Sequence, residues 1–232
     1  GWFLRLCAAV CALGAIPAFA QPAWEPLPPL PEPNGGFVCG HQESFIVVVG
    51  GTNWEGGKKN WLKHIRHFDS ATKTWKPEFD AELPGGPSAY AVACQVNENS
   101  LTLVGGTDGK ESQAKLMIID SIKTSEGFAI KGLGDAVVLS AGGDVWGRTL
   151  IVGGTSDAAN LAGVTKATHE IVFIDKPWKD RHWLAKRLAD YPGKPFATAA
   201  SAVAGNELFV FGGMNYDAEA NLPVNSAEAY AF

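Results

Sequence analysis

The stretch Ile46-Val47-Val48-Val49-Gly50-Gly51 is the first of four apolar segments that each end in a pair of glycines. The other three are Leu101-Thr102-Leu103-Val104-Gly105-Gly106, Leu150-Ile151-Val152-Gly153-Gly154 and Leu208-Phe209-Val210-Phe211-Gly212-Gly213. The first glycines of consecutive segments are 55, 48 and 59 residues apart. Recurrence at this spacing indicates internal repeats, each of which forms one supersecondary unit.

Further features recur in phase with the glycine pairs. A strand of small residues precedes each pair, and an apolar residue followed by aspartate comes after three of them, at Asp69, Asp120 and Asp175. An aromatic residue follows six to eight residues later, at Trp75, Phe128 and Trp183. Each repeat therefore predicts four strands, and a four-stranded antiparallel sheet of about 50 residues is the blade of a β-propeller. We expect the aspartates to cap the turn into the fourth strand.

The order of double glycine, aspartate and aromatic residue resembles the kelch repeat. We therefore predict an all-β, kelch-type β-propeller with blades at about 35–84, 85–134, 135–192 and 193–232, the last incomplete. Residues 21–33, in which Trp24 is followed by Leu27-Pro28, match the end of a blade and are expected to form the outer strand that closes the last blade. The ring could close at four blades, but we favour four blades of a larger ring.

The composition limits the class of protein. The chain has 232 residues, of which 46% are hydrophobic, so it can build a core. Its net charge of −5 argues against a nucleic-acid partner. Residues 1–20 combine Arg5, an apolar run and Ala18-Phe19-Ala20, which predicts a signal peptide and an exported, periplasmic or secreted protein. Because no later stretch is long enough to cross a bilayer, we expect no membrane association after cleavage.

Two cysteines, Cys39 and Cys94, remain after the signal peptide. Counting back eleven residues from the first glycine of each repeat gives Cys39, Cys94, Gly142 and Ser201. All four are small, which suits a crowded inner strand, so we interpret the cysteines as buried apolar residues. A disulfide between them remains an alternative in an oxidising compartment.

One region supports a closer resemblance. The loop from Gly50 to Trp61, with Thr52-Asn53-Trp54 and Lys58-Lys59-Asn60, leads through Asp69 and Trp75 to Ala89-Tyr90-Ala91. This run resembles the cyclically permuted sialic acid mutarotases, the N-acetylneuraminate epimerase-like kelch proteins, with Ala91 in place of a glycine. The resemblance implies six blades, no cofactor, and a catalytic Glu and Arg in a Pro-Gly-containing segment. That segment has no counterpart here, so the catalytic residues stay unknown.

The loops that follow the glycine pairs should open at one end of the propeller, together with the starts of the inner strands. The candidate substrate-binding residues at this end are Asn53, Trp54, Lys58, Lys59, Asn60, Trp61, Tyr90, Asp108, Asp157, Asn215 and Tyr216. Amides and carboxylates bond sugar hydroxyls, aromatic faces stack on sugar rings, and lysine pairs with a sugar carboxylate. Alternatively, Trp54 and Trp61 only pack the loop, and Lys58 and Lys59 are solvated.

Two functions are compatible with this sequence. The first is an exported sialic acid mutarotase-like isomerase, which opens and closes the ring of N-acetylneuraminate by acid and base catalysis. The second is a non-catalytic kelch propeller that binds a glycan or a protein. The five histidines are scattered, so we expect no metal site. The oligomeric state is left open.

Overall fold

The computed structural model describes residues 24–121, 124–157, 167–168, 171–175 and 183–232. The predicted signal peptide lies outside the described residues. These residues form β-strands and a single short helical turn, η1 (Pro77–Phe79). None of the described segments forms a helix long and apolar enough to cross a membrane.

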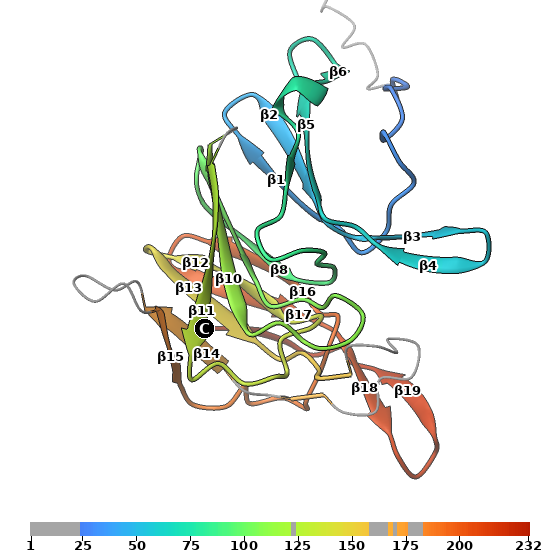
Figure 1. Ribbon diagram of the computed structural model, residues 1–232. Helices are drawn as coiled ribbons and strands as arrows, with labels where there is room; N and C mark the ends of the chain where they lie inside the picture. The colour runs from blue at the N-terminus through green and yellow to red at the C-terminus, as the bar shows by residue number, and fades with distance from the viewer. Residues whose placement is uncertain (1–23, 122–123, 158–166, 169–170, 176–182) are drawn as a thin grey trace, which may run out of the picture.

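The strands form consecutive antiparallel units whose order follows the repeats (Figure 1). Unit one contains β1 (Val38–Gln42), β2 (Phe45–Val49), β5 (His64–Asp69) and β6 (Thr74–Trp75), with β7 (Ala81–Glu82) also paired to β5. Unit two contains β8 (Val92–Asn97), β9 (Ser100–Val104), β10 (Lys115–Ser121) and β11 (Thr124–Lys131).

Units three and four continue the series. Unit three contains β12 (Ala141–Val145), β13 (Arg148–Val152), β14 (Ile171–Asp175) and β15 (Trp183–Arg187). Unit four contains β16 (Ala200–Ala204), β17 (Glu207–Phe211) and β20 (Ala229–Ala231). A short parallel pairing of Ile130 with Trp183 joins the outer strands of units two and three.

Each second strand packs its two faces against different neighbours. In unit one, Val47 and Val49 lie in a core with Leu101 and Leu103 of unit two. The same alternation places Val104 of unit two with Ile151 of unit three. In the next core, Val152 of unit three lies with Val210 of unit four. In units one to three the residue just before the glycine pair therefore faces the following unit, and in units two to four the residue before that faces the preceding unit.

The glycine pairs make the contacts between units. The amide of Gly51 donates to the carbonyl oxygen of Ser88 in the next unit at 2.8 Å, and Gly106 donates to Val137 at 3.0 Å. A Cβ atom on Gly50, whose φ is +61°, would lie 2.0 Å from the oxygen of Ser88. Only glycine allows this approach, so the packing between units explains why the glycine pair recurs in the sequence. Stacked four-stranded units with this regular packing define a β-propeller.

The predicted aspartate cap is confirmed in unit one, whereas the Asp120 carboxylate of unit two accepts the hydroxyl of Ser100 at 2.6 Å. The Asp69 carboxylate accepts hydrogen bonds from the amides of Ala71 and Thr72, which caps the turn before β6 as expected. Trp183 is buried between units two and three, and Trp75 packs edge-on against Phe68. Trp183 therefore belongs to the core, whereas Trp75 is only partly buried at the edge of unit one.

The proposed equivalence of the two cysteines is wrong by one residue. Cys39 pairs with Val48, but Cys94 pairs with Thr102, one position further from the glycines, and Ala93 holds the position equivalent to Cys39. The cause is a register shift between Gln95 and Asn97, which adds a residue to β8. Consequently Cys94 is buried but Cys39 is exposed, and both thiols are free.

Residues 24–33 lie along unit one and form no strand (Figure 1). Glu32 contacts His64 and Arg66 of β5, at 2.8 and 3.1 Å. The indole of Trp75 donates to the carbonyl oxygen of Pro28 at 3.4 Å. These contacts fall on the face of unit one that points away from unit two. That residues 21–33 close the last blade of a ring stays a prediction.

Candidate functional site

Four residues with left-handed backbone mark where the units meet at the end of the structure that carries the glycine pairs. They precede the inner strands at equivalent positions and are Gly36 (φ +66°), Tyr90 (+60°), Leu139 (+57°) and Thr198 (+63°). The amide of Tyr90 donates to the oxygen of Gly36 at 2.9 Å, that of Leu139 to Tyr90 at 3.0 Å, and that of Thr198 to Leu139 at 2.8 Å. This chain of bonds links all the units. Non-glycine residues adopt this backbone at a cost, so the arrangement is enforced by the fold.

The hairpin of β3 (Thr52–Glu55) and β4 (Lys58–Trp61) follows the first glycine pair and extends from the sheets on the same side as these bonds (Figure 1). Its Lys59 reaches Tyr90: the ammonium nitrogen lies 3.2 Å from the phenolic oxygen. The same nitrogen lies 4.7 Å from the ring centre of Trp61 and 5.1 Å from that of Tyr90. Lys59, Trp61 and Tyr90, here called the hairpin cluster, thus combine one cation with two aromatic rings.

The neighbouring loop holds Trp61 in place. The rings of Trp61 and Tyr90 meet edge to face, with centres 6.1 Å apart. On its other side Trp61 lies against Gly109, where an added Cβ would come within 2.1 Å of the indole. The hydroxyl of Thr52 lies 3.4 Å from that of Tyr90. The hairpin cluster is therefore built from two segments that are distant in sequence, and the loop at Gly109 supports it from a third.

The other predicted residues of the hairpin have different environments. Asn53 and Asn60 face each other across the strands, and the Asn60 amide donates to the Asn53 oxygen at 3.0 Å. Trp54 is 70% exposed and Lys58 is exposed, so the solvated alternative fits Lys58 but not Lys59. Trp54 lies opposite Lys59, on the other face of the hairpin from the amide pair, and its exposed indole can stack on a sugar ring.

Asp108 stabilises its own loop. Its carboxylate accepts the amides of Lys110 and Glu111 at 2.8 and 3.1 Å. Burial alone would raise the pKa of Asp108, but these amides hold it below its ordinary value. Asp157, in the equivalent loop of unit three, donates its amide to the Thr155 hydroxyl at 3.1 Å. The role of Asp108 that the structure describes is thus to shape the loop beneath Trp61.

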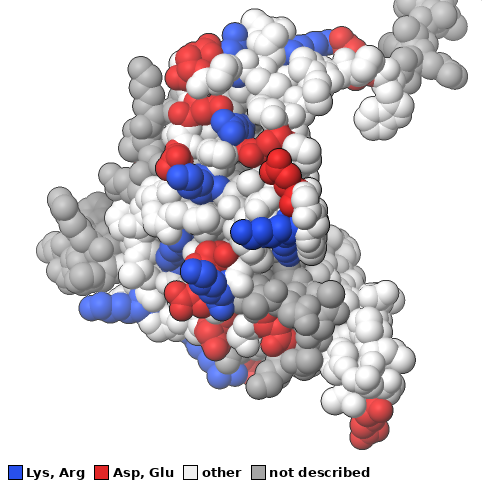
Figure 2. Space-filling view, turned by 45° about the vertical axis from the view of Figure 1, so that its right-hand side comes forward, with Lys and Arg blue, Asp and Glu red and all other residues white. Residues whose placement is uncertain are grey.

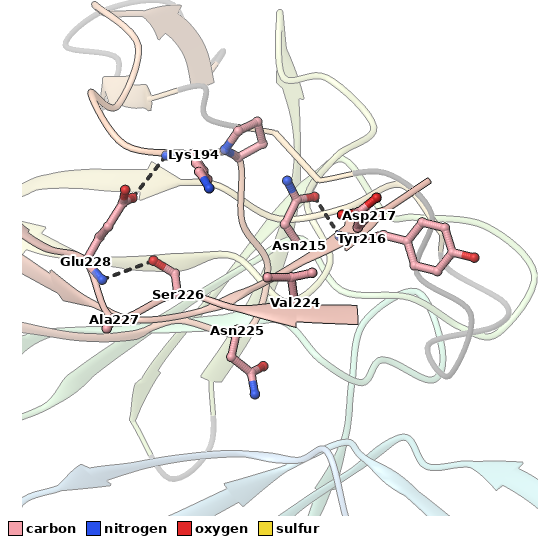
Figure 3. Close-up of a pocket in the computed structure, with 10 residues that line it drawn as sticks. Lys194, Asn215, Tyr216, Asp217, Val224, Asn225, Ser226, Ala227 and Glu228 are labelled. Carbon is pink, nitrogen blue, oxygen red and sulfur yellow. Dashed lines mark hydrogen bonds between the residues drawn. The ribbon is translucent and has the colours of Figure 1, made fainter. Parts of the chain in front are cut away.

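Asn215 and Tyr216 lie elsewhere, on the hairpin of β18 (Met214–Asp217) and β19 (Leu222–Asn225) that follows the last glycine pair. They line a pocket of about 410 Å³, within the range of small-ligand sites. Figure 3 shows the Glu228 carboxylate accepting the amide of Lys194, at 3.1 Å, and the Tyr216 ring directed away from the centre. We call this the β18–β19 pocket.

The structure brings together only part of the predicted site. Both hairpins project on the same side of the molecule (Figure 1), but within the described residues no hydrogen bond joins them. The sequence did not single out Thr52, Gly109, Lys194 or Glu228. Of these residues, only Gly109 could have been suspected from the sequence, because it lies in a glycine-containing turn. The roles of the other three depend on how the segments pack in the structure.

Charge is mixed over the surface. On the face that Figure 2 shows, lysine and arginine side chains alternate with aspartate and glutamate. Among the described residues, no group of three or more His, Cys, Asp or Glu side chains could hold a metal ion.

The comparisons with known proteins agree with the fold. No family model matches the sequence, and no curated protein sequence matches it significantly. The fold of the chain is nevertheless that of a β-propeller, and its structure matches 166 chains of solved structures. One of them is YjhT, with a TM-score of 0.66 and 16% identity. The match covers 86% of this chain and 66% of the YjhT chain. At this identity the likeness concerns the fold.

Proposed function

We propose that this chain is part of an exported sialic acid mutarotase-like enzyme, which exchanges the anomers of N-acetylneuraminate. The observation that carries the proposal is the position of Lys59, whose ammonium group is held between two aromatic rings beside Tyr90. The proposal also rests on the resemblance of the loop 50–61 and of Ala89-Tyr90-Ala91 to that family, and on a fold shared with YjhT.

The hairpin cluster suits a sugar acid. A carboxylate can pair with Lys59 and accept the hydroxyl of Tyr90, while Trp61 offers an apolar face to the carbons of the ring. The Asn53–Asn60 pair lies on the opposite face of the hairpin from Lys59 and Trp61, where its amides offer donors and acceptors to sugar groups that reach that face. Ring opening needs a base at the anomeric hydroxyl and an acid at the ring oxygen, with no cofactor. We assign neither role to a residue.

A glycan-binding propeller without catalysis is the second candidate. The observation that favours it is the 70% exposure of Trp54 on an extended hairpin, because an open aromatic platform suits a longer glycan.

Exchange NMR on N-acetylneuraminate separates the two candidates. An anomer exchange rate that rises with protein concentration supports the enzyme. Line broadening or saturation transfer without faster exchange supports glycan binding. The absence of both faster exchange and a binding signal would contradict both candidates. Lys59→Gln should weaken the response, whereas Lys58→Gln, on the exposed neighbour, should not.

A further inference from the structure

Tyr90 combines a strained backbone with a side chain that can transfer a proton. It is one of four equivalent residues with left-handed φ, the others being Gly36, Leu139 and Thr198. Of these four, Tyr90 alone carries an ionisable side chain. A tyrosine adopts this backbone at a cost, and a strained residue that the fold retains is a candidate for a functional role. The contacts of its hydroxyl indicate what that role is.

The ring of Tyr90 is held by its neighbours in units one and two. A Cβ atom on Gly36 would lie 2.3 Å from the Tyr90 ring, so the ring occupies space that only glycine leaves open. The ring centre of Trp61 lies 6.1 Å from that of Tyr90, edge to face. The Tyr90 amide donates to the Gly36 oxygen at 2.9 Å, and its carbonyl accepts the amide of Leu139 at 3.0 Å. The fold therefore defines where the phenolic oxygen lies.

The hydrogen bonds around the phenolic oxygen determine where its proton can go. Lys59 donates to this oxygen at 3.2 Å, because an ammonium group has no acceptor. The single proton of the Thr52 hydroxyl is directed to the carbonyl oxygen of Gly35 at 3.2 Å. Between the hydroxyls of Tyr90 and Thr52, which lie 3.4 Å apart, Tyr90 is then the donor. Within the described residues, the Tyr90 proton is thus held by one long hydrogen bond.

A substrate oxygen at normal hydrogen-bond distance would replace this long bond. Tyr90 is half-buried, so a substrate can reach its hydroxyl. When the proton leaves, the ammonium group of Lys59 stabilises the negative charge that develops on the phenolic oxygen, and the Thr52 hydroxyl can turn to donate a second hydrogen bond. The surroundings of Tyr90 therefore favour the release of a proton, as a general acid requires.

The chemistry of the proposed substrate brings its reacting atoms close to Tyr90. In N-acetylneuraminate the carboxylate is bonded to the anomeric carbon, so the anomeric hydroxyl and the ring oxygen are its immediate neighbours. A carboxylate paired with Lys59 leaves the ring oxygen near the Tyr90 hydroxyl, since the two side chains are in contact at 3.2 Å. The hydroxyl can then turn from the carboxylate to the ring oxygen as the ring opens.

We propose that Tyr90 is the general acid of the anomer exchange, an assignment that rests on the proposed function. As the bond between the anomeric carbon and the ring oxygen breaks, its electron pair stays on the ring oxygen, which takes the Tyr90 proton. A solvent water molecule accepts the proton of the anomeric hydroxyl as the carbonyl group forms. Ring closure on the other face of this carbonyl reverses both transfers and restores the phenol. Lys59 stabilises the phenolate between the two steps.

The limiting rate of anomer exchange tests this role, because a rate at saturating N-acetylneuraminate does not depend on affinity. Tyr90→Phe should lower the rate above the spontaneous one by about a hundredfold or more. Tyr191→Phe is the matched control and should behave as wild type. Its phenol is buried in the core between units three and four, and the phenolic oxygen has no hydrogen-bond partner among the described residues.

The outcomes separate this assignment from the proposed function. A wild-type rate equal to the spontaneous one contradicts both. If the wild type accelerates exchange and Tyr90→Phe retains the limiting rate, the acid role alone is refuted. A rise in KM without a fall in the limiting rate would then show that Tyr90 only binds the sugar. An equal loss with Tyr191→Phe would also contradict the assignment.

The variant Tyr90→3-fluorotyrosine tests the proton transfer without removing the hydroxyl. Fluorine makes the phenol a stronger acid and leaves its oxygen beside Lys59 and Thr52. In mildly acidic buffer, where the phenol stays protonated, a stronger acid should transfer its proton faster, so the limiting rate should rise severalfold. A structural or binding role would leave this rate unchanged, and an unchanged rate would overturn the proposal.

Discussion

The ammonium group of Lys59 lies 3.2 Å from the phenolic oxygen of Tyr90, which joins the hairpin of unit one to the first inner strand of unit two. Tyr90 also belongs to the backbone chain that runs from Gly36 to Thr198 through all units. The polar end of the candidate site is therefore attached to the row of hydrogen-bonded residues that links the units.

The first prediction concerns Tyr90→Phe. The change keeps the aromatic ring that contacts Trp61 and Lys59 but removes the hydroxyl that contacts Lys59 and Thr52. We expect affinity for N-acetylneuraminate to fall about tenfold, roughly 1.4 kcal/mol for a charge-assisted hydrogen bond. Titration calorimetry measures it. Unchanged affinity would show that the hydroxyl takes no part in binding.

Gly109→Ala tests the support of Trp61. The added methyl group would lie 2.1 Å from the indole, so Trp61 must move and sugar binding should weaken. Gly147→Ala is the matched control, because Gly147 also has positive φ (+72°) but open space around its Cβ position. Both variants should lose stability through backbone strain, roughly 1 kcal/mol. Only Gly109→Ala should change Trp61 fluorescence and affinity.

Thr198→Gly tests the left-handed backbone between units. Thr198 is exposed and β-branched at φ +63°, so glycine should stabilise the fold, by roughly 1 kcal/mol less the entropy that glycine adds to the unfolded chain. Thr198→Ala retains a Cβ and should give no comparable gain. Urea denaturation measures both. A loss of stability with glycine would mean that the threonine side chain stabilises the fold by more than glycine gains from the relief of backbone strain.

Because of His67, the folding stability of the protein should depend on pH. The side chain is 1% exposed, neither ring nitrogen has a hydrogen-bond partner among the described residues, and burial lowers its pKa, partly opposed by Asp80. Unfolded histidine titrates near pH 6.5, so protons favour the unfolded chain below that pH. Stability should be complete above about pH 6.5 and decline as the pH falls toward the lower folded pKa.

The variant His67→Phe isolates this effect, since the ring lies among Phe45 and Phe79. Denaturation between pH 5 and 8 should show a smaller loss of stability toward acid than in the wild type. His41→Gln, at an exposed histidine, is the control. Equal slopes for wild type and His67→Phe would refute the assignment.

The thiols should react at different rates. Burial raises the pKa of both thiols, that of Cys94 to about 12 with a smaller contribution from Asp144, but Cys39 is exposed to solvent. A thiol reagent under native, non-reducing conditions should therefore modify one thiol of the described chain at once and the second only on unfolding. Absence of both thiols in denaturant would demonstrate a disulfide and contradict the structure.

Much of the fold could be predicted because the repeat places its strongest signals where packing is most demanding. Gly50-Gly51 and its equivalents must be glycine to approach the next unit, and Trp183 must be large to fill the core between units two and three. The register of β8 could not be predicted, since the extra residue near Val96 has no compositional mark.

The site was less predictable. Lys59, Trp61 and Tyr90 were proposed from loop composition, but their contact depends on how units one and two pack. Asn215 and Tyr216 share the expected end of the structure, yet they line a separate pocket because their hairpin belongs to unit four. The left-handed row of Gly36, Tyr90, Leu139 and Thr198 has no shared residue type, so only the structure shows it.

The central proposal is most directly tested by the anomer exchange rate of N-acetylneuraminate, measured by exchange NMR with increasing protein. The account predicts a rate that rises in proportion to protein concentration and falls toward the spontaneous rate with Lys59→Gln, while Lys58→Gln behaves as wild type. A rate equal to the spontaneous one at every protein concentration would contradict the mutarotase function.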